Sequence, residues 1–230
     1  MGLLSHEHDG CMELYDAMRT TGTVRQFTDD PLPDDVLHRI LDNARFAPTG
    51  GNRQGVRVIV VRDASTRAAL ADLSVPGARR YAAQIANGES PWNPLQPCGV
   101  DAQTVAATEA PGPMTAPLRE APVVLVFCVD LGVVAATDQD LDRVGVIAGA
   151  SVYPFVWNVM LAARNEGFGG VTNTMAVAEE PRVKELLQIP DEFAIATLVP
   201  LGKPVHQVSK LKRRPVAEFA TRERFDGEAF

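Results

Sequence analysis

The sequence contains few cysteines and histidines, and neither type is grouped. Three cysteines stand at positions 11, 98 and 128, far apart and odd in number, which argues against a disulfide framework and a cysteine metal site. The four histidines, at 6, 8, 38 and 206, include no pair with metal-ligand spacing. We therefore expect no metal ion, and the isolated cysteines favour a reducing cytoplasm.

Positive charge is also in the minority. The formal net charge of −7 argues against a general nucleic-acid binder, so any anion site must be local. The N-terminus lacks a basic segment followed by an apolar run, which is not typical of a signal peptide. With 46% hydrophobic and 22% charged residues, the 230-residue chain has the composition of a soluble globular protein.

One long stretch, Val144 to Ala163, has no charge and is long enough to cross a bilayer. Its glycines, Ser151, Pro154 and Asn158 dilute its hydrophobicity, so we predict no membrane span. A helix that is apolar on all sides must be buried by protein if not by lipid. We therefore expect a central helix shared with a second subunit.

The remaining pattern mixes helices and strands without a strict βαβ alternation. Helical spacing predicts helices over residues 13–18, 34–45, 66–73 and 180–189. Runs of β-branched and aromatic residues predict strands over 57–63, 122–130 and 193–204. The mixture favours an α+β fold with helices flanking a sheet.

Residues 88–118 differ from this pattern because they are rich in proline and poor in charge and period. A loop this long inside a compact chain is either a functional lid or a disordered linker. Trp92 and Met114 are large apolar residues that a mere linker has no need of, which favours the lid.

Four polar segments carry the residue types that bind anions and planar rings. Each of them alone is also typical of a turn, a helix cap, a strand entry or a solvated basic run. Together they indicate a nucleotide-type ligand, with arginines and hydroxyls at a phosphate and glycines where backbone approaches a ring. The candidates are Arg19, Thr21, Thr23 and Arg25; Thr49, Asn52 and Gln54; Gly169, Gly170, Thr172, Asn173 and Thr174; and the basic run Lys212, Arg213 and Arg214.

Other nucleotide and hydrolase motifs are not present in the sequence. The run "GFGGVT" lacks the G-x-G-x-x-G spacing and follows a predicted helix, so a Rossmann fingerprint is not supported. There is no Walker loop, and Ser151 does not stand in a G-x-S-x-G elbow.

From about Met12 to Phe219 the order of segments resembles the nitroreductase superfamily of FMN-dependent oxidoreductases. The most specific marker is "ARFAPTGGNRQ", which is similar to the family's A-P-S-x-x-N-x-Q, and the late "LGKP" strand end also matches. The runs "GGVTNTM" and "KLKRRP" are most similar to the iodotyrosine-deiodinase branch.

The resemblance implies an α+β nitroreductase-like fold, in which helices flank a central, mainly antiparallel sheet and two chains form an intertwined homodimer with FMN at the interface. It implies a mobile N-terminal tail at 1–11 and a single FMN-binding domain at 12–230. Within that domain, residues 79–118 would form a lid insertion, and residues 205–230 would wrap around the partner chain.

The resemblance also gives the polar residues roles. Thr21, Thr23 and Arg25 match phosphate-binding positions, with Arg213 reaching the phosphate from the tail. Gly22 stands where many members carry an arginine, for which Arg19 would compensate. Further matches are Thr49, Asn52 and Gln54 in the A-P-S segment, Gly169 to Thr174 beside the flavin ring, where Thr172 would tune it, and Tyr81 and Trp92 in the lid.

The implied activity is an NADH- or NADPH-consuming reductase that acts on nitroaromatic, quinone or similar small aromatic substrates by a ping-pong hydride cycle, with no catalytic acid or base. Two departures leave alternatives open. Gly55-Val56 replaces the family's Pro-Trp, and the deiodinase lid's Glu, Tyr and Lys have no counterparts in residues 79–97, which disfavours a tyrosine-derivative deiodinase. The alternatives are a flavin enzyme of dehalogenase, desaturase or flavin-fragmenting type, or a flavin-binding protein without catalysis. Neither nucleic acid nor a membrane is expected as a partner.

Overall fold

The computed structural model describes residues 12–230, so the predicted tail at 1–11 lies outside the described residues. Its centre is a four-stranded sheet with the strand order β1-β2-β4-β3, in which every neighbouring pair is antiparallel. The strands are β1 (Val56–Val61), β2 (Val123–Asp130), β3 (Gly169–Gly170) and β4 (Phe193–Gly202). This arrangement confirms the predicted α+β class and the mainly antiparallel sheet.

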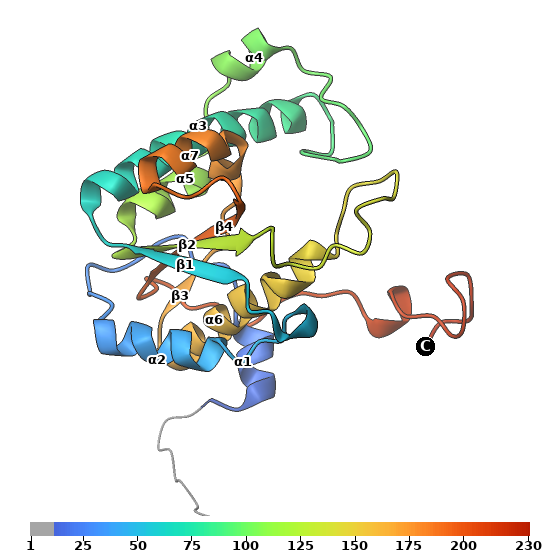
Figure 1. The fold of residues 1–230 in the computed structure, drawn as a ribbon, viewed down its shortest axis with the longest axis horizontal. Coiled ribbons are helices and arrows are strands. Elements are labelled where there is room, and N and C mark those ends of the chain that lie inside the picture. Colours follow the sequence, from blue (N-terminus) through green and yellow to red (C-terminus); the bar gives the residue numbers. More distant parts are fainter. Residues whose placement is uncertain (1–11) are drawn as a thin grey trace, which may run out of the picture.

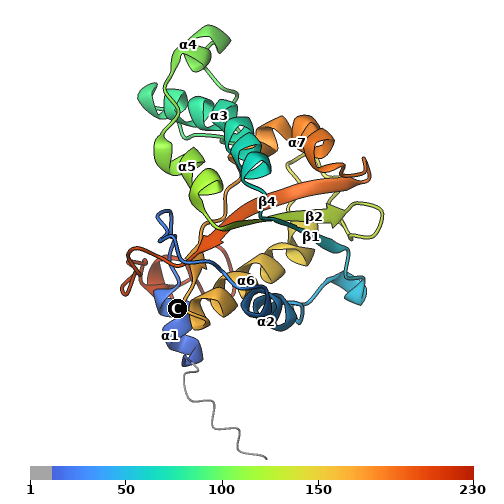
Figure 2. The ribbon, with the colours of Figure 1, turned by 90° about the vertical axis from the view of Figure 1, so that its left-hand side faces the viewer.

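Helices cover both faces of the sheet (Figures 1 and 2). On the lower face lie α2 (Asp34–Ala44) and α6 (Tyr153–Asn165), with α1 (Leu14–Thr20) packed on α6. On the upper face lie α3 (Ala64–Ala86), α5 (Gly112–Glu120) and α7 (Glu180–Leu187), and α4 (Ala102–Ala107) is outermost. Three layers therefore build the molecule.

Strand β2 explains why both faces are covered. Its alternate residues, Val123, Leu125, Phe127 and Val129, pack in the core with α2 and α6. The intervening residues, Val124, Val126 and Cys128, pack in the other core with α3 and α7. Because side chains alternate along a strand, the unbroken apolar run of β2 is what a strand buried on both faces requires.

Several predicted boundaries differ from the structure. The short helix predicted at 66–73 extends to Ala86, and it begins where Asp63 accepts a hydrogen bond from the backbone N–H of Thr66 at 2.7 Å. The segment predicted as irregular at 88–118 contains α4 and most of α5. Asp101 caps α4 by accepting a hydrogen bond from the backbone N–H of Thr104. Helix α5 begins after Pro111 and carries Pro113 in its first turn, where proline is tolerated.

The prediction of one continuous helix over Val144–Ala163 was wrong at its start. The α-helix begins at Tyr153, after a short 3-10 turn over Ala148–Ser151. Pro154 lies in the first turn of α6, where its fixed φ suits a helix start. Upstream, the carboxylate of Asp138 accepts hydrogen bonds from the backbone N–H groups of Val146 and Ile147 at 2.7 and 3.3 Å, which holds that segment in a loop.

None of the described helices combines the length and the apolar run that crossing a membrane requires.

Candidate active site

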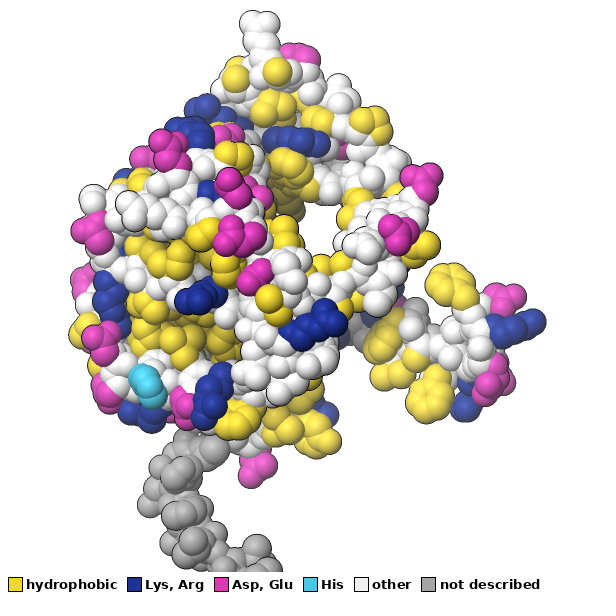
Figure 3. Space-filling model, viewed as in Figure 1, with side chains coloured by type: hydrophobic (Ala, Val, Ile, Leu, Met, Phe, Trp, Pro, Cys, Tyr) yellow, Lys and Arg dark blue, Asp and Glu magenta, His cyan; other side chains and the backbone are white. Residues whose placement is uncertain are grey.

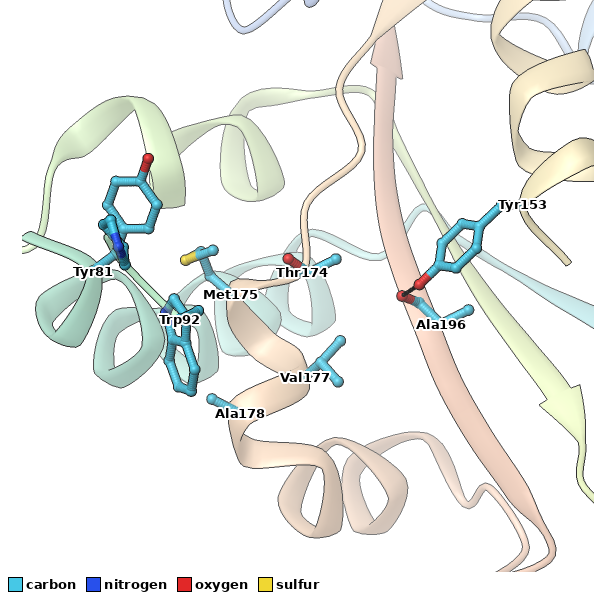
Figure 4. Close-up of a pocket in the computed structure, with 9 residues that line it drawn as sticks. Tyr81, Trp92, Tyr153, Thr174, Met175, Val177, Ala178 and Ala196 are labelled. Atoms are coloured by element: carbon cyan, nitrogen blue, oxygen red, sulfur yellow. Dashed lines mark hydrogen bonds between the residues drawn. The ribbon is translucent and has the colours of Figure 1, made fainter. Parts of the chain in front are cut away.

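An aromatic cavity of about 510 Å³ lies between the upper helices and the sheet (Figure 4). Tyr81 projects from α3, Trp92 from the loop that follows it, and Tyr153 from the first turn of α6. Thr174 lies on the wall between them, ahead of the 3-10 turn at Met175–Glu179. Three candidates from two predicted segments, Tyr81 and Trp92 from the lid and Thr174 from the run at 169–174, therefore meet in one cavity.

Figure 3 shows this face of the molecule. Hydrophobic side chains gather around a deep hollow beneath the segment that follows α3, and positively charged side chains lie near its upper rim. The Tyr153 hydroxyl donates a hydrogen bond to the carbonyl of Ala196 on β4 at 3.3 Å. This bond fixes one aromatic wall to the sheet and takes up the hydroxyl proton.

Trp92 is held in place by a buried glutamine. Its backbone φ is 54°, an uncommon value for a residue with a side chain. The backbone N–H of Trp92 donates to Oε1 of Gln84 at 3.1 Å, and Gln84 is only 1% exposed. On the other side, Nε2 of Gln84 donates to Glu89 at 2.9 Å. The loop is therefore anchored to α3 at the backbone of Trp92.

The electrostatics of this loop depend on Glu89. The side-chain amides of Gln84 and Asn87 donate hydrogen bonds to it and lower the pKa of its carboxyl, with a smaller contribution from the charge of Arg80. A lowered carboxyl pKa means that the ionised form is favoured by folding. Glu89 therefore stays charged at neutral pH and does not serve as a general acid there.

The segment after β3 has a buried residue between two exposed ones. Asn173 is buried; its backbone exchanges two hydrogen bonds with Leu198, and its side chain donates to the carbonyl of Met114 at 2.7 Å and accepts from the N–H of Met175 at 3.0 Å. Its side chain thus ties α5 to the 3-10 turn, and its backbone ties both to β4. Thr172 and Thr174, on either side, remain exposed.

Gly169 and Gly170 allow close packing of backbone. A Cβ on Gly170 would lie 2.3 Å from the carbonyl oxygen of Pro200, and one on Gly169 would lie 2.7 Å from Val24. The N–H of Val24 donates to the carbonyl of Gly170 at 2.8 Å. The glycine pair therefore seats the arginine and threonine segment, 19–25, against the edge of the sheet.

The predicted phosphate residues divide between two hollows. Thr23 and Arg25 line one of about 410 Å³ with His206, Glu120 and further residues along α5. Arg19, Thr21 and Arg213 line another of about 660 Å³ with Lys210 and the exposed ring of Trp157. The same two segments, 19–26 and 206–213, run past both hollows.

Gly22 lies where these two segments meet. A Cβ there would lie 3.1 Å from Val208 and 3.2 Å from Leu211, so the tail packs directly on this glycine. Thr21 is buried, and its hydroxyl donates to the carbonyl of Ala17 at 2.7 Å, which closes α1. Arg19 and Arg25 remain exposed.

Thr49, Asn52 and Gln54 form a tight turn ahead of β1. The N–H of Gln54 donates to the Thr49 hydroxyl at 3.0 Å, and φ is positive at Gly51, Asn52 and Gln54. The N–H of Gly50 donates to the Ser151 hydroxyl at 3.1 Å, which places this turn beside the start of α6. The turn lines none of the three hollows described above.

Cys128 is not suited to catalysis. Cys128 is 2% exposed on β2, and burial raises the pKa of its thiol to about 11. A thiol with that pKa is almost entirely protonated at neutral pH and is a weak nucleophile. Among residues 12–230 no group of three or more metal-ligating side chains occurs.

Comparison with known proteins identifies the fold's relatives. A family model described as the nitroreductase family matches residues 18–203. The chain belongs to the nitroreductase family. This confirms the resemblance drawn from the polar segments and their order.

Individual members differ in what they do. An iodotyrosine deiodinase of Nematostella vectensis is 25% identical over 90% of this chain and 73% of its own, and an NADH dehydrogenase of Thermus thermophilus is 26% identical over 84% and 88%. A structure of oxidized iodotyrosine deiodinase bound to FMN and 3-iodo-L-tyrosine superposes with a TM-score of 0.66 at 21% identity, covering 92% of this chain and 99% of that one. The NADPH:FMN oxidoreductase of Vibrio harveyi complexed with NAD+ gives 0.64 at 20%, covering 92% and 77%. These proteins share the fold of this chain, and their names describe different reactions.

The sequence did not indicate several residues of this candidate site. They lie beside predicted candidates but stand outside the four polar segments, so only the tertiary structure brings them in. The residues are Arg80, Gln84, Ser151, Tyr153 and His206. The signal that could have found Arg80 is its place in "RRY", directly before the lid candidate Tyr81.

Proposed function

We propose that this nitroreductase-family oxidoreductase binds FMN and uses NADH or NADPH to reduce nitroaromatic, quinone or similar electron-poor aromatic compounds in a ping-pong cycle. The observation that carries the proposal is the aromatic cavity, in which Tyr81, Trp92 and Tyr153 surround Thr174. Apolar walls with a few polar groups are typical of sites for small planar ligands. The free cysteines, Cys98 and Cys128, agree with a cytoplasmic setting.

The donor set fits FMN. Arginines and hydroxyls are suited to a phosphate ester because they supply charge-assisted and neutral hydrogen bonds. Thr23 and Arg25 on one side of the tail, and Arg19 and Arg213 on the other, would hold the phosphate at the hollows that residues 19–26 and 206–213 line. Gly22 is consistent with this assignment because, without a side chain, it leaves room for Val208 and Leu211 of the tail to pack on residues 19–26.

When bound, FMN supplies the hydride transfer, first from the nicotinamide donor and then to the acceptor. The chain's own residues orient the reactants and exclude water. The exposed hydroxyls of Thr172 and Thr174 are the groups proposed to donate toward the flavin ring, while Asn173 between them keeps the segment rigid. Trp92 and Tyr81 would cover the acceptor, as parts of the proposed 79–118 lid.

A second copy of the chain would complete the site. The turn that carries Thr49, Asn52 and Gln54 lies beside the start of α6 and lines none of the three hollows. In a homodimer with FMN at its interface, one copy would contribute this turn to the ligand of the other. We propose this arrangement, with residues 205–230 wrapping around the partner.

The phosphate assignment predicts loss of FMN from the variant Arg25→Ala/Arg213→Ala. Hydrogen bonds to charged groups contribute about 1.5 to 3 kcal/mol each, so each arginine removed should weaken FMN binding at least about tenfold. The measurement is FMN content by visible absorbance after dialysis, with titration of each single variant. Arg182→Ala, an exposed arginine on α7, is the control and should keep its FMN. A double variant that remains as yellow as the wild type contradicts the assignment.

The reductase activity is tested with a nitrofuran and NADPH. The proposal expects NADPH-dependent loss of nitrofuran absorbance by the FMN-loaded protein, with parallel lines in double-reciprocal plots. Protein that holds FMN but consumes neither NADH nor NADPH would contradict the proposed activity and support flavin binding without catalysis. A donor-reduced protein that leaves nitrofurans and quinones intact would instead favour dehalogenation, desaturation or flavin fragmentation.

A further inference from the structure

Arg80 stacks on Trp92, a wall of the aromatic cavity. Its guanidinium carbon lies 4.0 Å from the centre of the indole ring, which is the geometry of a cation–π contact. The Nε of Arg80 is buried and has no hydrogen-bond partner. A buried donor without an acceptor is costly, so such groups call for an explanation.

No carboxylate in the described part of the chain forms an ion pair with Arg80. Glu89 is the acid that interacts with it through charge alone. The oxygens of Glu89 already accept hydrogen bonds from the side-chain amides of Gln84 and Asn87 and from the N–H of Gly99, at 2.9, 2.8 and 3.1 Å. The guanidinium of Arg80 therefore remains free to bind an external anion.

Trp92, on which Arg80 stacks, is held in place by the protein itself. Gln84 holds the backbone of Trp92 at a positive φ, a conformation that costs energy and persists only where the surroundings impose it. Trp92 is 39% exposed and faces the cavity shared with Tyr81 and Thr174. A planar ligand in this cavity would thus meet an indole on which the positively charged guanidinium of Arg80 is already stacked.

We propose that Arg80 is a specificity-determining residue, and that the cavity selects planar, electron-poor acceptors bearing a carboxylate. The acceptor ring packs against Trp92 and Tyr81, and its carboxylate pairs with the guanidinium of Arg80 at the rim. This inference rests on the proposed reductase function, but it adds a charge requirement that the function itself does not contain.

The test compares 4-nitrobenzoate with 4-nitrobenzamide, which share the ring and the nitro group and differ in charge. For each protein, kcat/KM is measured for both compounds with NADPH as donor. For each protein, the kcat/KM for 4-nitrobenzoate is divided by that for 4-nitrobenzamide. The wild-type ratio is then divided by the Arg80→Met ratio, which cancels the difference in electron affinity between the two compounds. We expect a quotient of about fivefold or more, the upper range for one ion pair near a surface, arising mainly in KM.

Two further variants separate charge from packing. Arg79→Met removes the neighbouring arginine, whose Nε is likewise buried and unpartnered but which is not among the arginines in cation–π contacts, and it should leave the ratio unchanged. Arg80→Lys keeps the charge and should retain most of the preference. A quotient within twofold of one, or an equal loss in Arg79→Met, overturns the proposal.

A binding measurement distinguishes failure of this inference from failure of the reductase function. Calorimetric titration of the oxidised protein without donor should give a dissociation constant for 4-nitrobenzoate that rises about fivefold in Arg80→Met, with that for 4-nitrobenzamide unchanged. Selective binding without reduction of either compound supports the charge requirement and refutes the reductase. Reduction of both without charge selection refutes the charge requirement alone.

Discussion

At the scale of single residues, Gly77 shows how close packing limits composition. It lies within α3, where alanine would ordinarily stabilise a helix. A Cβ at Gly77, however, would lie 2.3 Å from the carbonyl oxygen of Met175, in the backbone of the 3-10 turn that lines the aromatic cavity. Helix and turn can approach this closely only because position 77 has no side chain.

Gly77→Ala should therefore destabilise the protein by about 2 kcal/mol, since overpacking against backbone outweighs the gain in helix propensity. The measurement is the free energy of unfolding in urea, with the FMN content held constant. Gly112→Ala is the matched control, because a Cβ there meets nothing within 4 Å at the start of α5. Equal stabilities for the Gly77 variant and the wild type would show that α3 and the turn separate easily.

The sequence shows which residues have the chemistry to bind a ligand, but it does not always show whether their side chains face the site. Thr174, Tyr81 and Trp92 do meet in one cavity. Asn173 has the same polar character, yet its side chain is bonded within the protein, because burial between β4 and α5 demands partners for its amide. Sequence alone does not reveal which polar residue of a run faces inward.

At the scale of elements, the strands and α2 could be predicted because their apolar periods are strong. Strand β2 and helix α2 lie within two residues of the predicted bounds. The helices α4 and α5 could not be predicted, because α4 is short and α5 contains two prolines. The start of α6 could not be predicted because a side chain of the preceding loop, Asp138, binds the backbone N–H groups of Val146 and Ile147.

Asp138 organises the loop at residues 131–147. The carboxylate is 5% exposed; it accepts from the N–H of Val146 and from Arg143, and these hydrogen bonds lower its pKa. Asp138→Ala should free the loop, so that the amide hydrogens of Val146 and Ile147 exchange at least about tenfold faster, as expected when a charge-assisted hydrogen bond is lost. Hydrogen–deuterium exchange detected by mass spectrometry measures this.

Asp142→Ala is the control for that experiment, because Asp142 is exposed in the same loop. It should leave the exchange rates unchanged. Similar rates in the Asp138 variant and the wild type would mean that the loop is held by other contacts.

At the scale of the whole molecule, the C-terminal residues extend away from the body (Figure 1). The hydrogen bonds of the backbone from Val216 onward stay within the tail itself. Its apolar side chains, Val216, Phe219, Phe225 and Phe230, are 51% to 102% exposed, and Tyr153 and Trp157 on α6 are exposed as well. Apolar exposure on this scale is typical of a surface that a partner covers.

The proposed homodimer predicts a sedimentation mass of twice the chain, with or without FMN. Removing residues 215–230 takes away the exposed tail and keeps Arg213, so the shortened chain should dissociate at least about tenfold more readily, since a few apolar side chains at an interface contribute more than 1.4 kcal/mol. Sedimentation velocity over a range of concentrations measures both proteins. A full-length chain that sediments as a monomer at every concentration would contradict the arrangement.

The central claim is that residues scattered along the chain converge on one FMN. The most direct measurement is the visible spectrum of the purified protein, recorded with added FMN and then after anaerobic NADPH or NADH. The account predicts a bound flavin spectrum that saturates at one FMN per chain and bleaches when the nicotinamide is added. A protein that stays colourless and takes up no FMN at micromolar concentration would contradict it.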